Sequence, residues 1–217
     1  MDLVAWSGVP TLWQKAFELA WQTFQEGSNP IGALIADASG TVVATGKSAV
    51  RAPVSGVKLA HCEIAHAEVN ALMQLDNRLH SKRQSAQYTL YSTLEPCPLC
   101  MSALYMSDVR SLSFAATDSF AGSVNLLGTT PYLQRKQRRV DGPVPGLGEV
   151  SIFFNVYYNV LHCDPATEIH DAFAEDYPEA VATALSLAEQ DVLKLREIQR
   201  VDTAFDKVVE VLRKPDA

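Results

Sequence analysis

Several features of secreted and membrane-spanning proteins are missing from this sequence of 217 residues. It contains no Asn-x-Ser/Thr acceptor site, no basic segment leading into an apolar one at its start, and no run of about 20 apolar residues. It has only four cysteines, and without a secretion signal they do not favour a disulfide framework. We therefore predict a cytoplasmic protein with no membrane contact, whose cysteines bind metal, undergo redox chemistry or are buried.

A broad excess of basic residues is also missing. The net charge is −7, and residues 1–163 carry 12 basic and 12 acidic side chains, whereas residues 164–217 carry 6 and 13. Such a chain does not have the basic surface that polyanion-binding proteins usually need, and its acidic end would repel a polyanion. One basic run fits either a solvated loop or a local nucleic-acid contact, and it consists of Arg135, Lys136, Arg138 and Arg139.

Apolar periodicity predicts helices and strands in alternation over the first half of the chain. Apolar residues recur at helical spacing in the segments 12–24, 66–75 and 98–106. Shorter β-type runs predict strands at 31–36, 41–44, 87–94 and 109–115. This order favours the α/β class, with helices packed on a mixed sheet.

The second half of the chain is less regular. Residues 117–148 are rich in glycine, proline and polar residues and predict a long loop, and residues 151–161 fit a strand or a buried helix, with the helix favoured. Few helix breakers interrupt two later segments, which we expect to be helical, 178–200 and 201–213. We divide the chain into a domain at 1–163 and an acidic helical C-terminal extension at 164–217, packed on the core or on a partner subunit.

Two short strings carry the chemistry, His66-Ala67-Glu68 and Pro96-Cys97-Pro98-Leu99-Cys100. Together they match the His-x-Glu and Pro-Cys-x-x-Cys pattern that is typical of zinc deaminases. His66, Cys97 and Cys100 supply three zinc ligands, and a catalytic zinc site keeps its fourth position open for water. The two-residue spacing lets both thiolates of a first helical turn face one metal ion, and the helix N-terminus helps to keep them ionised.

Glu68 lies two residues after the ligand His66, close enough to reach a zinc-bound water. Zinc lowers the pKa of such a water to about 7, so a hydroxide can attack the amino-bearing carbon of a ring. Glu68 would act as the proton shuttle, carrying protons to the ring nitrogen and to the departing ammonia.

The segments Ser92–Cys100 and His66–Leu72 resemble the two motifs of the cytidine deaminase-like superfamily, in the branch of tRNA adenosine, guanine and cytosine deaminases. Asn29–Ala33 and Phe114–Asp118 are similar to neighbouring strands of that branch. The resemblance covers residues 12–127. It implies a three-layer α/β/α sandwich with a central mixed sheet of about five strands, a Zn²⁺ cofactor and a homodimer. It also implies substrate contacts at Ser48, Ala67, Glu95 and Asp118.

The sequence departs from that branch at several places. Ser48, in Gly46-Lys47-Ser48, stands where the branch often has a substrate-binding asparagine. Asp118 fits a turn as well as a substrate contact. The insertion at 134–148 and the acidic tail match nothing in the branch, so we expect these two regions to set specificity.

Three functions follow from these patterns. The favoured one is hydrolytic deamination of a small purine or pyrimidine base or nucleoside. The first alternative is tRNA adenosine-to-inosine deamination, in which the run from Arg135 to Arg139 grips phosphates. The second is a catalytically silent scaffold with a deaminase fold, although a binding module has no need for the carboxylate of Glu68.

Other roles for the same residues are open but weaker. Cys97 and Cys100 also fit a redox pair, or a closed zinc site with His61 or Cys62 as fourth ligand, but either leaves Glu68 without a role. Cys62 and Cys163 are most simply free thiols. No ligand pattern surrounds His61, His80, His162 and His170. Three aromatic residues fit core packing better than closure over a planar substrate, namely Phe154, Tyr157 and Tyr158.

Overall fold

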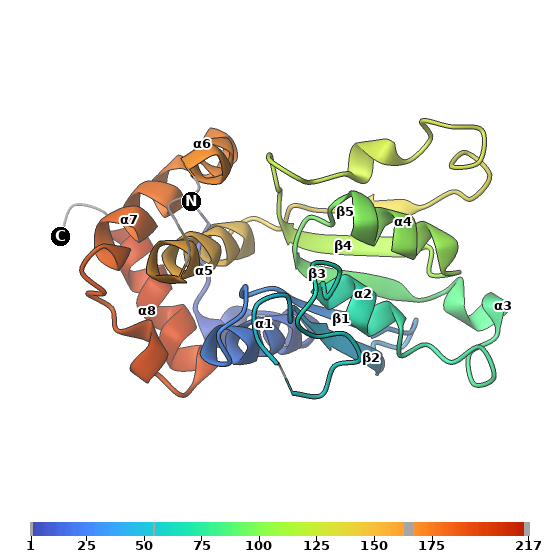
Figure 1. Cartoon of the computed structure of the whole chain (residues 1–217), viewed down its shortest axis with the longest axis horizontal. Helices are drawn as coiled ribbons and strands as arrows, with labels where there is room; N and C mark the ends of the chain where they lie inside the picture. Colours follow the sequence, from blue (N-terminus) through green and yellow to red (C-terminus); the bar gives the residue numbers. More distant parts are fainter. Residues whose placement is uncertain (1, 54, 163–166, 215–217) are drawn as a thin grey trace.

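The computed structural model describes residues 2–214 apart from residue 54 and residues 163–166, so the prediction for Cys163 lies outside the described residues. The strands are β1 (Gly32–Ala36), β2 (Val42–Lys47), β3 (Thr89–Leu94), β4 (Ser111–Ala116) and β5 (Arg139–Asp141). They form one sheet in the order β2-β1-β3-β4-β5 (Figure 1). β1 pairs antiparallel with β2 and β3, whereas β4 pairs parallel with β3 and β5. The sheet is therefore mixed, as predicted.

Helices cover both faces of this sheet. α1 (Thr11–Gln25) and α5 (Leu147–His162) contact strands on one face, and α2 (Ala67–Leu72) and α4 (Pro98–Met106) pack together on the other. Because side chains alternate along a strand, Leu34 of β1 joins the first core and Ile35 joins the second. The prediction of a three-layer α/β/α sandwich is confirmed.

Two glycines let helices lie unusually close to the strands. A Cβ atom on Gly46 of β2 would lie 2.0 Å from the carbonyl oxygen of Ala67, and one on Gly32 of β1 would lie 2.2 Å from that of Ala16. Any side chain at these positions would push the helix away from the sheet. Gly46 thus fixes the position of α2.

The segment 117–148 is more ordered than the sequence predicts. Its last part contains β5, which pairs with the first half of β4 and completes the sheet. The strand could not be predicted because Arg139-Val140-Asp141 is short, exposed and charged. It is stabilised by backbone pairing with β4 and not by burial of its side chains. The loop prediction for 117–148 is therefore wrong for these three residues, for the short helix at Val124–Leu126, and for Leu147 and Gly148, which begin α5. The short helices of the described chain are η1 (Trp6–Gly8), α3 (Lys82–Ser85), η2 (Val124–Leu126) and η3 (Leu195–Glu197).

The C-terminal part is helical, but with different bounds from those predicted. It consists of α6 (Thr167–Asp176), α7 (Pro178–Ala188) and α8 (Val201–Arg213). The continuous helix expected at 178–200 is wrong, because α7 ends at Ala188 and the backbone turns at Asp191 and Lys194, both with positive φ. The turn buries Leu193 and Leu195 in the core. A helix that continued straight would not bring these two side chains there.

These helices share the core on the α1 side of the sheet. α7 packs on α5, and α8 contacts α1, α5 and α7 (Figure 1, red). Phe205 and Val208 of α8 are fully buried, and the ring of Phe205 meets that of Phe17 of α1 edge to face. The boundary at residues 163 and 164 stays a prediction. Within the described part of the chain, no helix combines the length and the apolar character needed to cross a bilayer.

Candidate active site

The three predicted zinc ligands meet where α2 and α4 begin. His66 is the last extended residue before α2, and Cys97 holds the same position before α4. Pro98 starts α4, where a missing N–H costs nothing, and Cys100 follows in the first turn. Because the two helices pack side by side, their N-terminal ends bring the three side chains together.

The spacing of the ligand atoms fits a tetrahedral zinc ion. His66 Nδ1 lies 3.5 Å from Cys97 Sγ and 3.4 Å from Cys100 Sγ, and the two sulfur atoms are 3.7 Å apart. Usual zinc bond lengths in a tetrahedron give about 3.6 Å between nitrogen and sulfur and about 3.8 Å between two sulfurs. Two soft thiolates and one imidazole are also the donors that zinc prefers. The residues therefore fit zinc in both geometry and chemistry.

The two thiols have opposite proton affinities. Hydrogen bonds from Cys100 and His66 lower the pKa of Cys97 to about 4. The hydrogen bond with Cys97, together with burial, raises the pKa of Cys100 well above its ordinary value. The hydrogen bond with Cys97 also raises the pKa of His66. Without zinc, the cluster holds one thiolate and one thiol.

Glu68 points at this cluster from the first turn of α2. Its side chain is 4% exposed, its Oε1 accepts a 2.8 Å hydrogen bond from Ser92 Oγ, and its Oε2 lies 3.3 Å from Cys100 Sγ. Burial raises the pKa of Glu68. A carboxyl group with a raised pKa is suited both to accept and to donate a proton. Ser92 was not among the predicted site residues, although it opens the segment Ser92–Cys100 that resembles a family motif, and the structure shows it to be fully buried.

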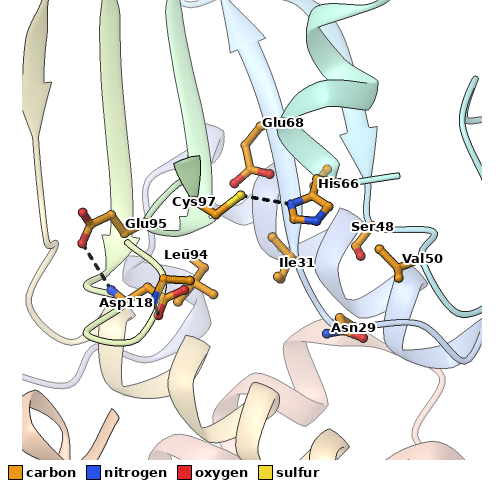
Figure 2. Close-up of a pocket in the computed structure, with 12 residues that line it drawn as sticks. Asn29, Ile31, Ser48, Val50, His66, Glu68, Leu94, Glu95, Cys97 and Asp118 are labelled. Atoms are coloured by element: carbon orange, nitrogen blue, oxygen red, sulfur yellow. Dashed lines mark hydrogen bonds between the residues drawn. The ribbon is translucent and has the colours of Figure 1, made fainter. Parts of the chain in front are cut away.

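A cavity of about 130 Å³ opens beside the ligand cluster (Figure 2). All four predicted substrate contacts, Ser48, Ala67, Glu95 and Asp118, line it together with His66, Glu68 and Cys97. No role at the site was predicted for the other lining residues, which are Asn29, Ile31, Val50, Leu94 and Ala121. These five come from loops and strand ends whose meeting point depends on the fold.

Two of the predicted substrate contacts also hold the loop at 118–124. Glu95 accepts hydrogen bonds from the backbone N–H groups of Asp118 (3.3 Å) and Val124 (3.1 Å). Asp118 accepts others from Phe120 and Ala121, so it forms the turn that was its alternative role. Burial raises the pKa of Asp118. Whether any of the four contacts a substrate stays a prediction.

The basic run lies at the other end of the sheet. Arg139 pairs with Ser111 at the start of β4, whereas the cavity lies beyond the end of this strand at Ala116, about 17 Å away along five strand residues. The Nη2 atom of Arg138 donates to the carbonyl oxygens of Leu104, Tyr105 and Ser107, at the C-terminal end of α4. Lys136 pairs with Asp108 at 3.4 Å. Half of the run is thus used to hold α4.

Several alternative roles gain no support from this geometry. Among the described residues, the metal-ligand cluster contains neither His61 nor Cys62. His80 contacts Tyr88. The aromatic residues of α5 lie in the core on the far side of the sheet, where Tyr157 Oη donates to Asp191 and Tyr158 Oη donates to the carbonyl of Gly27.

The chain is similar to several known deaminases. Residues 9–116 match the family model for the cytidine and deoxycytidylate deaminase zinc-binding region. The tRNA-specific adenosine deaminase of Rickettsia typhi is 28% identical over 111 residues, which cover 51% of this chain and 70% of that protein. The cytosine deaminase of Candida albicans is 29% identical over 114 residues, which cover 52% of this chain and 70% of that protein.

A solved structure adds evidence for the fold. Guanine deaminase from Nitrosomonas europaea aligns with a TM-score of 0.53 at 24% identity, over 73% of this chain and 87% of the other. The ligand cluster, the buried glutamate and the family match agree with one another. The chain therefore belongs to the cytidine deaminase-like superfamily of zinc-dependent deaminases, which are hydrolases that act on carbon–nitrogen bonds.

Proposed function

We propose that this protein hydrolytically deaminates a small purine or pyrimidine, either a free base or a nucleoside. The observation that carries the proposal is the position of Glu68, whose buried carboxyl group contacts the ligand Cys100 and lines the same small cavity. A binding module would leave this carboxyl group without a role. The cavity volume of about 130 Å³ is well below the 300–1,000 Å³ usual for larger ligands, which favours a small ring.

The residues of the chain divide the chemistry among them. His66, Cys97 and Cys100 hold zinc, which when bound supplies a Lewis acid that ionises water near neutral pH. Glu68 takes up one proton of the attacking water and passes it to the ring nitrogen. It then takes the proton of the newly bound hydroxyl group and passes it to the departing amino group, which leaves as ammonia. Ser92 holds the carboxyl group in place by its hydrogen bond. Ile31, Val50 and Leu94 provide apolar walls against which a planar ring packs.

A panel assay tests this function. Ammonia release is measured from the zinc-loaded protein with bases, nucleosides, nucleotides and a tRNA transcript, and Glu68→Ala serves as the control. We expect release from a small molecule, and we expect Glu68→Ala to keep its zinc but lose turnover. No release from any compound would contradict the proposal and favour the scaffold alternative.

The second candidate is tRNA adenosine deamination, which the similarity to tRNA-specific adenosine deaminases favours. Arg135 and Arg139 are the exposed members of the basic run and would contact phosphates. If this candidate is correct, the tRNA transcript is the compound of the panel that releases ammonia. Changing both arginines to Ala would then remove activity on tRNA without changing ammonia release from adenosine.

The homodimer implied by the resemblance is also a proposal. Apolar side chains stay exposed on α4 and on the loop that packs beside it, among them Leu99, Met106 and Tyr132. Light scattering after gel filtration should give twice the chain mass of 23.7 kDa. A mass equal to one chain would contradict the dimer.

A further inference from the structure

Asn29 is a polar residue of the cavity that neither the ligand cluster nor the fold explains. It lies in the loop between α1 and β1, directly before Pro30, and lines the cavity. Its side-chain Oδ1 is buried and has no hydrogen-bond partner. A buried acceptor without a partner destabilises a folded protein, and pairing with a ligand in the adjoining cavity would relieve this cost.

The surroundings of Asn29 define which part of a ligand it would meet. Figure 2 shows Asn29 on the side of the cavity away from Glu68, with Ile31 between them and Ser48 nearby. The reacting amino group must lie at the Glu68 end, because the proton shuttle acts there. The opposite edge of the ring then faces Asn29 and the buried Ser48.

The amide of asparagine presents an acceptor and a donor side by side. Its complement is a ring edge that carries an N–H group next to an acceptor. In cytosine, the edge opposite the amino group has N1–H beside the O2 carbonyl, and in adenine it has N9–H beside N3. In the nucleosides, the sugar replaces this N–H hydrogen and adds bulk to the edge.

We propose that Asn29, assisted by Ser48, determines specificity in this cavity by pairing its amide with the far edge of a free amino-substituted base. The inference rests on the proposed function and narrows it, because a nucleoside has lost the N–H that this amide recognises. The small cavity volume supports a base without its sugar. Glu68 and the zinc ligands carry out the deamination, and Asn29 determines which ring binds.

The test compares bases with their nucleosides. The ratio kcat/KM for ammonia release is measured for cytosine and cytidine and for adenine and adenosine. The proteins are the zinc-loaded parent, Asn29→Leu, which has nearly the same shape, and Asn77→Leu, which changes an exposed asparagine. We expect the parent to prefer one base over its nucleoside by about tenfold or more, and Asn29→Leu to lose about tenfold on that base only.

A stability measurement separates this role from a structural one. Because Asn29→Leu removes an unpaired buried acceptor, we expect its Tm to rise by about 2–4 °C at unchanged zinc content. Unchanged kcat/KM on the base, a preference of the parent for the nucleoside, or a lowered Tm would each overturn the inference.

If no compound in the panel releases ammonia, the proposed function is overturned. The role of Asn29 is then tested by measuring binding instead of turnover. Calorimetry with the same free bases then compares the zinc-loaded parent with Asn29→Leu. Weaker binding by Asn29→Leu would support Asn29 as the base-recognising residue. Equal binding, or no binding by the parent, would overturn it.

Discussion

At the scale of single residues, the candidate site is built from groups that modify each other's proton affinity. Cys97 and Cys100 are three residues apart, yet hydrogen bonds lower the pKa of Cys97, whereas a hydrogen bond and burial raise that of Cys100. The carboxyl group of Glu68 adds a fourth proton-binding group beside Cys97, Cys100 and His66. Metal loading and catalysis should therefore both depend on pH.

Zinc binding is expected to strengthen as pH rises. The thiol of Cys100 is protonated at neutral pH because its pKa is raised, and it must lose this proton to bind the metal. The proton taken up at lower pH competes with zinc, so affinity falls as pH falls. Competition with a chelator dye at pH 6, 7 and 8 measures this, and an affinity independent of pH would contradict it.

Ser92→Ala should shift the pH dependence of turnover. The hydrogen bond from Ser92 lowers the pKa of Glu68, so its loss moves that pKa up. Because the proposed mechanism needs ionised Glu68 to accept the first proton, the acidic limb of kcat/KM against pH should move to higher pH, with about a tenfold loss at neutral pH. Ser113→Ala, a buried serine on the neighbouring strand β4, is the control and should leave the profile unchanged.

The cluster of candidate metal ligands and the position of Glu68 beside it could be predicted from the sequence because they depend on local spacing. Two residues separate the cysteines, and one separates His66 from Glu68. Asn29 and Val50 could not be found in this way, since they reach the cavity only through the packing of β1 and the loop after β2. Ser92 lies inside an identified motif. Its hydrogen bond to Glu68 could not be predicted, because the two residues are 24 positions apart and meet only in the fold.

At the scale of elements, α2 and α4 are positioned by features outside the motifs. α2 lies against Gly46 of β2, and α4 is held at its C-terminal end by Arg138. The helix starts thus meet because the strand and the insertion hold both helices in place. This use of Arg138 could not be predicted, because a basic run is equally typical of a solvated loop.

Gly46→Ala should damage the metal site without touching a ligand. The added Cβ would collide with the backbone of Ala67 and push α2 off the sheet, which we expect to cost about 3 kcal/mol of unfolding free energy. Zinc content should fall together with stability. Gly8→Ala is the control, because its Cβ would meet nothing closer than 3.8 Å. A stable, fully zinc-loaded Gly46→Ala protein would show that α2 is positioned in another way.

Arg138→Ala should also destabilise the protein, by about 2–3 kcal/mol, since three carbonyl groups at the end of α4 lose a charged donor. Arg135→Ala removes an exposed charge of the same run and should change stability little. Urea unfolding of both variants gives the comparison. Equal stability of the two would mean that Arg138 is not a structural residue.

At the scale of the whole molecule, the sandwich carries an additional layer of helices. The α/β order and the helical end of the chain were predicted from periodicity and composition. The break between α7 and η3 was not, because residues 189–200 contain neither glycine nor proline. The break depends instead on the burial of Leu193 and Leu195 in the shared core.

A chain ending at residue 163 tests the predicted domain boundary. Removing α7 and α8 would expose the apolar faces of α1 and α5, including Phe17, which packs on Phe205. We expect this shortened chain to aggregate or to unfold at a much lower temperature than the parent. A folded, zinc-binding product would instead establish residues 1–163 as a domain in their own right.

The separation of the basic run from the cavity has a consequence for the effect of salt. A neutral base that enters the cavity displaces no condensed counterions, so its turnover should be nearly independent of ionic strength. A single-stranded RNA held by the two exposed arginines of the run would release about one ion at each, which gives a slope of about −1.4 in a plot of log affinity against log salt concentration. To contact both places, the RNA would have to extend about 17 Å along β4. Ionic strength therefore separates the two substrate classes before either substrate is identified.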